Sequence, residues 1–121
     1  MLIVLTTVSS PDEGASLAEK IAIAGLAACV QILPRMTSVY IWEGKLQKEG
    51  EHLLLIQTLP EKYDELEAFI TANHSYDVPE IVAIDAEKVS GPYLEWMKEV
   101  IGERWKRKTE RWEIEGENSK K

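Results

Sequence analysis

The chain contains few side chains that bind transition metals strongly: one cysteine, Cys29, and two histidines, His52 and His74. A structural zinc site needs four nitrogen or sulfur ligands at close spacing, and these three residues lie far apart in the sequence. We therefore expect no zinc site within one chain. A weaker divalent-metal site is a hypothesis for His74 and Glu80. These side chains could act together with carboxylates of neighbouring copies across an interface. The alternative is that His74 is a loop histidine with a polar partner.

The sequence gives no positive indication of catalysis. It has no Ser/His/Asp or Cys/His arrangement that would activate a nucleophile. It also lacks a glycine-rich phosphate loop, because Gly44, Gly50 and Gly91 are isolated glycines. No acid, base or nucleophile can be assigned, so the chain is not predicted to be an enzyme.

Composition and charge indicate an acidic, globular protein of one domain. The chain has 121 residues, of which 45% are hydrophobic and 29% charged, and its net charge is −7. This balance argues against nucleic-acid binding, which needs a concentrated basic face. No apolar run approaches the roughly 20 residues that span a bilayer. The N-terminus lacks the pattern of a signal peptide and a single cysteine allows no intrachain disulfide, so we expect a cytoplasmic protein.

Hydrophobic patterns predict an α+β fold. Strands are expected at 2–8, 29–42, 46–58 and 80–86, and helices are expected to begin near Ser10, Pro60 and Ser90. Ser10 can cap the first helix and Gly25 can end it, while Thr58 is the predicted cap of the second. The order β-α-β-β-α-β plus a C-terminal helix predicts a ferredoxin-like sandwich, with one sheet and two helices on one of its faces.

The most unusual predicted element is a long β-hairpin built from segments 29–42 and 46–58. Each arm spans about 13 residues, or roughly 40 Å at about 3.3 Å per residue, whereas strands usually have about 5–6 residues. Gly44 is expected to give the turn a positive φ, and Pro34 predicts a bulge or an edge position. A body of this size cannot cover such arms, so the projecting part would expose backbone groups that need a partner. We therefore predict a closed homo-oligomer.

Four segments of the chain match the pattern of one protein family. In order, they are Ala27-Ala28-Cys29-Val30-Gln31-Ile32, Ser38-Val39-Tyr40-Ile41-Trp42-Glu43-Gly44, His74-Ser75-Tyr76-Asp77-Val78-Pro79-Glu80-Ile81 and Tyr93-Leu94-Glu95-Trp96. Over residues 1–101 the sequence thus resembles CutA, the divalent-cation tolerance family. The resemblance implies a CutA-like ferredoxin-fold domain at 1–102, followed by a charged tail at 103–121 that it does not cover. It also implies a tight trimer, with hairpins paired across subunits in an architecture similar to the PII signalling proteins.

The resemblance implies a link to copper tolerance and the binding of divalent metals, but the ligand pattern of the family is incomplete here. Members credited with copper binding carry a thiol at the position of Thr6 and a second histidine at the position of Asn73. Only His74 carries over. The usual family residues at Gln31 and Gln57 are asparagine and lysine, and the loss of that lysine makes an anionic ligand less probable.

Together, the resemblance and the residue types predict a small-molecule cleft between subunits, with a partly apolar floor and a few polar groups. Cys29 is most simply a small buried hydrophobe, although a thiol facing this cleft is the alternative. The predicted ligand-binding residues are Cys29, Gln31, Trp42, Glu51, Tyr76 and Trp96.

Two functions follow from this sequence. The first is a trimeric divalent-cation tolerance protein that binds metal ions, with copper as the possible ion and His74 and Glu80 as metal residues. The alternative is a PII-like signalling or scaffold module that binds a small ligand at clefts between subunits. The sequence predicts no nucleic-acid partner and no membrane partner, and it does not identify a protein partner.

Overall fold

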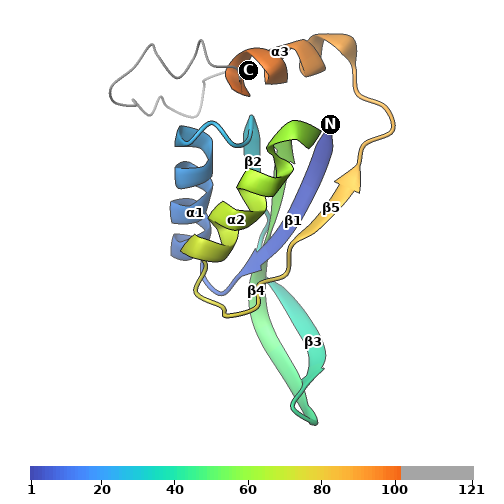
Figure 1. The fold of residues 1–121 in the computed structure, drawn as a ribbon. Coiled ribbons are helices and arrows are strands. Elements are labelled where there is room, and N and C mark those ends of the chain that lie inside the picture. The colour runs from blue at the N-terminus through green and yellow to red at the C-terminus, as the bar shows by residue number, and fades with distance from the viewer. Residues whose placement is uncertain (102–121) are drawn as a thin grey trace.

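The computed structural model describes residues 1–101, which form one antiparallel sheet with α-helices on one of its faces (Figure 1). The predicted tail at 103–121 lies outside the described residues. None of the described helices is long and apolar enough to cross a membrane. The elements are β1 Leu2–Val8, α1 Pro11–Ile23, β2 Cys29–Ile32, β3 Met36–Trp42, β4 Lys45–Thr58, the 3₁₀ turn η1 Pro60–Lys62, α2 Tyr63–Asn73, β5 Val82–Asp85 and α3 Gly91–Ile101.

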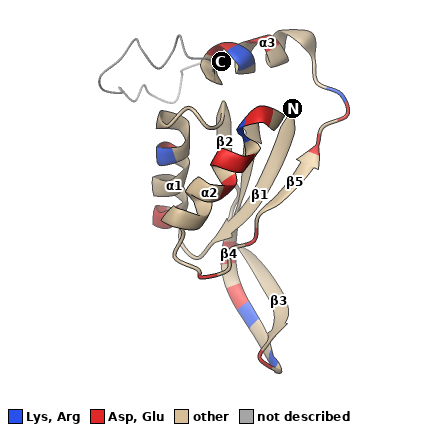
Figure 2. Ribbon diagram, viewed as in Figure 1, with Lys and Arg blue, Asp and Glu red and all other residues tan. Residues whose placement is uncertain are grey.

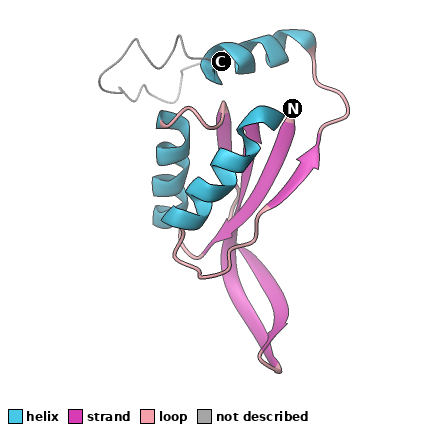
Figure 3. Cartoon of the chain, viewed as in Figure 1, coloured by secondary structure: helices cyan, strands magenta, loops and turns pink. Residues whose placement is uncertain are grey.

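The strand order is the one expected for a ferredoxin-like sandwich. The central path is β2-β4-β1-β5, every described pairing is antiparallel, and β3 pairs with the far half of β4. Helices α1 and α2 lie together over one face, while α3 lies beyond the end of the sheet (Figure 3). The predicted α+β class and element order are confirmed, with the first hairpin arm divided into β2 and β3.

Local signals set the ends of α1 where the sequence predicts them. The Ser10 hydroxyl accepts a hydrogen bond of 3.1 Å from the backbone N–H of Glu13, which satisfies one of the free donors of the first turn. At the other end Gly25 has a φ of 72°, a conformation that glycine adopts without steric cost. The N–H of Leu26 then reaches back to the carbonyl of Ile21 at 3.2 Å and closes the helix.

The predicted cap at Thr58 is wrong. The turn η1 precedes α2, and α2 begins at Tyr63 without a side-chain cap. Thr58 is the last residue of β4 and is fully buried, so its hydroxyl donates instead to the carbonyl oxygen of Leu26 at 2.7 Å. A buried polar group takes the partner that the tertiary packing offers. The strand expected at 80–86 is also shorter and covers Val82–Asp85.

The long hairpin is present and projects well beyond the helices (Figure 1). Its first arm breaks between β2 and β3, around Pro34, while β4 runs without a break for 14 residues. Glu43 and Gly44 form the turn with φ values of 51° and 75°. Two successive positive φ angles define the turn whose twist matches that of the flanking strands.

The core lies between the sheet and helices α1 and α2. One face of β1 and β4 contributes Val4, Val8, Leu54 and Ile56, all fully buried. The helices cover them with Leu17, Ile21, Leu66 and Ile70. This packing leaves the other face of the sheet without a helical cover.

Thr6 is the exception in this core, and it leads to a first prediction. Its side chain is fully buried, yet its hydroxyl has no hydrogen-bond partner within residues 1–101. An unpaired buried hydroxyl destabilises the folded state by about 1–3 kcal/mol. We expect Thr6→Val to raise the free energy of unfolding by about 1 kcal/mol in urea, measured at one fixed chain concentration. Thr58→Val is the matched control, because it removes an equally buried hydroxyl that is bonded, and it should lower stability by about 1 kcal/mol. A loss of stability in Thr6→Val would contradict the prediction.

The second face of the sheet, called the open face below, is largely apolar. Residues paired across antiparallel strands point to the same side, so the register defines its members: Ile3, Leu5, Thr7, Cys29, Gln31, Leu53, Leu55, Gln57, Val82 and Ile84. Val82 and Ile84, on the edge strand β5, are 46% and 49% exposed. A continuous apolar sheet surface of this kind is typical of a protein interface.

Candidate functional site

A cavity of about 770 Å³ lies between the hairpin and segment 76–80, which leads into β5. We call it the hairpin pocket. Four carboxylates line it, from Glu49, Glu51, Asp77 and Glu80, and three aromatic rings, from Tyr40, Trp42 and Tyr76. Its size is that of a site for a small organic molecule rather than for a bare ion.

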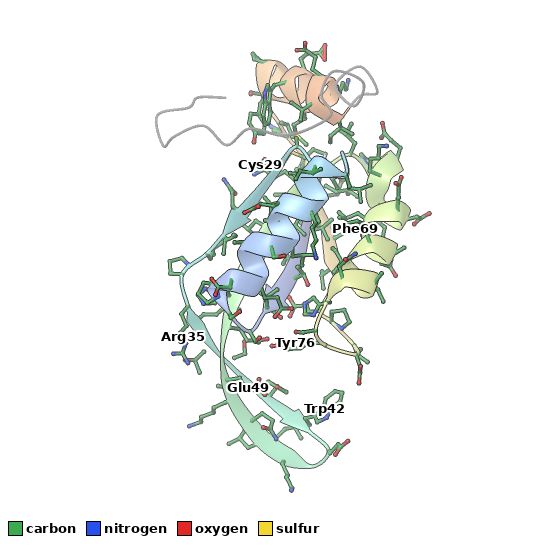
Figure 4. The ribbon with its side chains drawn as sticks, turned by 90° about the vertical axis from the view of Figure 1, so that its left-hand side faces the viewer. Cys29, Arg35, Trp42, Glu49, Phe69 and Tyr76 are labelled. Atoms are coloured by element: carbon green, nitrogen blue, oxygen red, sulfur yellow. The ribbon has the colours of Figure 1, made fainter. Side chains whose placement is uncertain are left out.

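The pleat of the hairpin places the aromatic and acidic side chains on one side. Alternate residues of a strand share a face, so Tyr40 and Trp42 of β3 point the same way as Glu49 and Glu51 of β4. Figure 4 shows Trp42 and Glu49 extending from the hairpin on the side where Tyr76 lies. The sequence spacing thus brings the aromatic and acidic groups together without any further loop.

Two tyrosines fix two of the carboxylates. The Tyr40 hydroxyl donates to Glu49 at 2.5 Å, and this bond to a carboxylate raises the pKa of Tyr40 to about 12. The Tyr76 hydroxyl donates to Glu51 at 2.8 Å. Burial is the largest cause and this hydrogen bond is the second, and together they raise the pKa of Tyr76 far above its usual value. Both tyrosines therefore stay protonated and act as donors at neutral pH.

His74 anchors the segment that carries Tyr76. Its Nε2 donates to the carbonyl oxygen of Thr7 at 2.7 Å, and its Nδ1 accepts from the backbone N–H of Tyr76 at 3.0 Å. A carbonyl can only accept and an N–H can only donate, so these contacts identify the neutral Nε2–H tautomer. The side chain is fully buried. These two hydrogen bonds give it polar partners of the kind expected if His74 is a loop histidine and not a metal ligand.

Glu13 of α1 holds the same segment from the other side. Its carboxylate accepts the backbone N–H of Ser75 at 3.2 Å and the hydroxyl of Ser9 at 3.1 Å, and one oxygen lies 3.8 Å from Nδ1 of His74. Burial raises the pKa of the Glu13 carboxyl, but hydrogen bonds from Ser75 outweigh it, so the pKa lies below its usual value. The stabilisation from this ionised carboxylate is present above the ordinary pKa and is lost as the pH falls through the lowered pKa.

The pocket carries strong negative charge. Among residues 1–101 no Lys or Arg lines it, and Figure 2 shows acidic residues on β4 and in the segment before β5. Clustered charge of one sign in a concave site raises the local concentration of counter-ions. The site is therefore suited to cations and unsuited to phosphate or other anions.

The residues within 1–101 do not form a complete metal site. No group of three or more His, Cys, Asp or Glu side chains in this part of the chain is placed to hold an ion. A metal at His74 would have to replace one of its two hydrogen bonds. Glu80 is exposed at the pocket and free of such a constraint. The sequence hypothesis of a His74–Glu80 metal site therefore stays a prediction that needs further ligands.

The predicted ligand-binding residues fall into two groups within one chain. Trp42, Glu51 and Tyr76 line the hairpin pocket together with Glu80. Cys29, Gln31 and Trp96 lie near the other end of the open face. Cys29 pairs with Gln57 on β4, and Gln57 is six residues from Glu51, or roughly 20 Å at about 3.3 Å per residue. A cleft between subunits that is lined by all six of these residues stays a prediction.

The second group is organised by hydrogen bonds around Gln57. Its side-chain nitrogen donates to Gln31 at 3.3 Å, and its oxygen accepts from the Tyr93 hydroxyl of α3. The Tyr93 ring lies 5.4 Å from that of Trp96. Cys29 is partly buried beside this cluster. The hydrogen bond from Tyr93 connects α3 to the open face, and the two bonds of Gln57 explain how this polar residue is accommodated there.

Among the aromatic and acidic residues that line the pocket, sequence reasoning missed three: Tyr40, as a ligand-facing residue, Glu49 and Asp77. The signal for the first two is the alternation along the hairpin arms, since Tyr40 and Trp42 share a face, as do Glu49 and Glu51. No local signal identifies Asp77, because its place in the pocket depends on the loop path.

Comparisons with known proteins agree over almost the whole described chain. A family model described as "CutA1 divalent ion tolerance protein" matches residues 2–100. The chain is 44% identical over 97 residues to "Protein CutA, chloroplastic" of Arabidopsis thaliana, which covers 80% of this chain and 53% of that protein. It is 38% identical over 100 residues to "Divalent-cation tolerance protein CutA" of Thermus thermophilus, covering 83% of this chain and 97% of that protein. The chain thus spans about half the length of the plant relative.

A solved structure gives the same result. CutA1 from Oryza sativa superposes with a TM-score of 0.82 at 43% identity, covering 84% of this chain and 94% of that one.

Proposed function

The chain belongs to the CutA1 divalent ion tolerance family, and from that premise we propose that it binds divalent cations as a homotrimer. The observation that supports cation binding is the hairpin pocket, which the described part of the chain lines with four carboxylates and no basic residue. Copper is the expected ion by resemblance. Carboxylate oxygens also suit harder divalent ions, so the charge of the pocket does not by itself select copper.

We place the ion at Glu80, completed by ligands from a neighbouring copy. Glu80 is an exposed carboxylate of the pocket that accepts no tyrosine hydroxyl among the described residues, whereas Glu49 and Glu51 each accept one. Divalent ions need several oxygen ligands at about 2.0–2.6 Å, more than Glu80 alone supplies. His74 fits a role in positioning segment 76–80, because both of its ring nitrogens are engaged.

Two features support the homotrimer. Among the described residues β3 pairs only with β4, and β5 pairs only with β1, so each leaves one strand edge unpaired. Such edges seek a partner, and pairing of two different edges between copies closes into a ring when the rotation permits. The open face and the exposed hairpin residues Ile41 and Leu46, at 65% and 62% exposure, provide apolar surface for the same contact.

We expect Cu(II) titration by calorimetry to saturate on the wild-type protein and to be weakened by Glu80→Gln about tenfold, which corresponds to about 1.4 kcal/mol. The substitution keeps the size of the side chain and removes one charged ligand. Glu19→Gln, at an exposed position in the middle of α1, makes the same charge change outside the pocket and should leave the affinity unchanged. Equal weakening by both variants would mean that only net charge matters, and it would remove Glu80 from the site.

A second candidate function is favoured by the volume of the hairpin pocket. A cavity of about 770 Å³ is large enough for a metabolite, as a PII-like signalling or scaffold module would require. A thermal-shift screen of metals, nucleotides and small acids and amines should then find a stabilising small molecule, and a flat response would count against this function. The cytoplasmic location expected from the sequence stays a prediction, since the Arabidopsis relative is named as chloroplastic.

A further inference from the structure

The strongest unexplained feature of the pocket is the buried carboxylate of Glu51. Its residue is only 7% exposed and lines the cavity. A buried charge is strongly unfavourable unless it is paired. The hydroxyl of Tyr76 gives it one hydrogen bond at 2.8 Å but no opposite charge.

The basic residues of the hairpin do not neutralise Glu51. The guanidinium of Arg35 packs directly against the Cα of Gly50, and Figure 4 shows Arg35 on the opposite side of the hairpin from Tyr76. Lys48 pairs with Val39 and therefore points to that opposite side as well. Lys45 lies across from Trp42 at the hairpin tip and is not among the residues that line the pocket. No Lys or Arg among residues 1–101 therefore forms an ion pair with Glu51, and a cation from outside this part of the chain would supply the missing charge.

The walls of the pocket identify the kind of cation that would fit. The rings of Trp42, Tyr40 and Tyr76 line it together with the carboxylates. Aromatic faces attract organic cations such as alkylammonium and guanidinium groups, and tryptophan does so most strongly. A small, strongly hydrated metal ion gains little from rings and needs a close shell of oxygens. The described residues do not provide that shell.

We propose that the hairpin pocket binds a small organic cation of the alkylammonium or guanidinium class, between the carboxylate of Glu51 and the rings of Trp42 and Tyr76. The charged head lies against Glu51, and the cavity volume accommodates the rest of the molecule. This binding activity is separate from the metal site proposed at Glu80. It uses the same pocket but depends neither on metal coordination nor on the identity of the metal.

The test compares choline with 3,3-dimethylbutan-1-ol, its uncharged isostere, by calorimetry on the full chain at one salt concentration. We expect choline to bind at least tenfold more tightly than the alcohol. Agmatine, which carries a guanidinium group, should compete with choline. Glu51→Gln keeps an acceptor for the Tyr76 hydroxyl and should weaken choline binding at least tenfold. Trp42→Leu should weaken it about fivefold, whereas Trp42→Phe, which retains a ring, should restore most of the affinity.

Controls separate this site from general charge effects and from misfolding. Glu19→Gln carries the same charge change on α1 and should bind choline like the wild type. Circular dichroism and sedimentation of each variant show whether the fold and the assembly are retained. Equal binding of choline and the alcohol, or undiminished choline binding by both Glu51→Gln and Trp42→Leu, would overturn the proposal.

Parallel Cu(II) titrations distinguish this proposal from the metal function. Copper binding without choline binding would reject the organic-cation site and leave the metal proposal intact. Choline binding without copper binding would support the organic-cation site and reject the metal proposal. Binding of neither ligand would reject both.

Discussion

An Ile84→Glu variant is expected to sediment as a single chain at concentrations where the wild-type protein forms the proposed trimer. Ile84 lies on β5, in the open face of the sheet, and is 49% exposed within one chain. A glutamate there can remain hydrated in the isolated chain. In the proposed trimer it would be enclosed by apolar surface, and burying an unpaired charge costs several kcal/mol. The proposed trimer would therefore lose a large part of its association free energy.

The matched control is Ile23→Glu. Ile23 is the last residue of α1 and is 47% exposed, almost the same fraction as Ile84. It lies on the helical side of the sheet, away from the open face. Both variants therefore change the same residue type at the same exposure, and only the surface differs. Analytical ultracentrifugation should show single chains for Ile84→Glu and assembled protein for Ile23→Glu. Assembly of both variants would contradict an interface on the open face.

Local chemistry was sufficient to predict much of the fold. Ser10 and Gly25 set the ends of α1, because capping and positive φ depend on residues within one turn. Glu43 and Gly44 form the predicted hairpin turn for the same reason. The order of the periodic segments indicates the α+β class, and the four family-like segments indicate CutA without any information on contacts.

Contacts between distant segments could not be predicted in the same way. Thr58 has the residue type of a helix cap, but the carbonyl of Leu26, 32 positions away, is its actual partner. The predicted ligand residues share suitable chemistry, yet Glu51 and Cys29 are placed at separate ends of the sheet by the register of β4. Composition suggests which groups could bind a ligand, whereas strand register decides which of them meet.

The role of His74 shows this limit most clearly. From sequence it was a candidate metal ligand, because it stands in a loop near Glu80. Its main partner, the Thr7 carbonyl, is 67 positions away, so no spacing rule could reveal it. The bond pattern makes His74 a support for segment 76–80 and, through the hydrogen bond from Tyr76 to Glu51, for one wall of the hairpin pocket.

His74→Ala should therefore lower the free energy of unfolding by about 2–4 kcal/mol. The substitution leaves the carbonyl of Thr7 and the N–H of Tyr76 without their partner, and each unpaired buried group costs about 1–3 kcal/mol. It also removes a fully buried ring and leaves a void. Urea unfolding at a fixed chain concentration measures the change. Asn73→Ala is the neighbouring control, because the exposed side chain of Asn73 donates a hydrogen bond to the carbonyl of Phe69 within the same helix. This variant should change the free energy of unfolding by about 0.5 kcal/mol or less.

Copper titration of the same variant separates support from coordination. If His74 acts by holding segment 76–80, His74→Ala should lose stability, and the remaining folded protein should keep copper affinity within about threefold, or about 0.7 kcal/mol. A variant that keeps wild-type stability but loses copper binding would instead identify His74 as a metal ligand. A metal ligand must offer a lone pair, whereas Nε2 carries the proton donated to Thr7 and the Nδ1 lone pair accepts the N–H of Tyr76. A metal on this ring would therefore displace one of these two hydrogen bonds, so the stability and copper measurements together decide between the two roles.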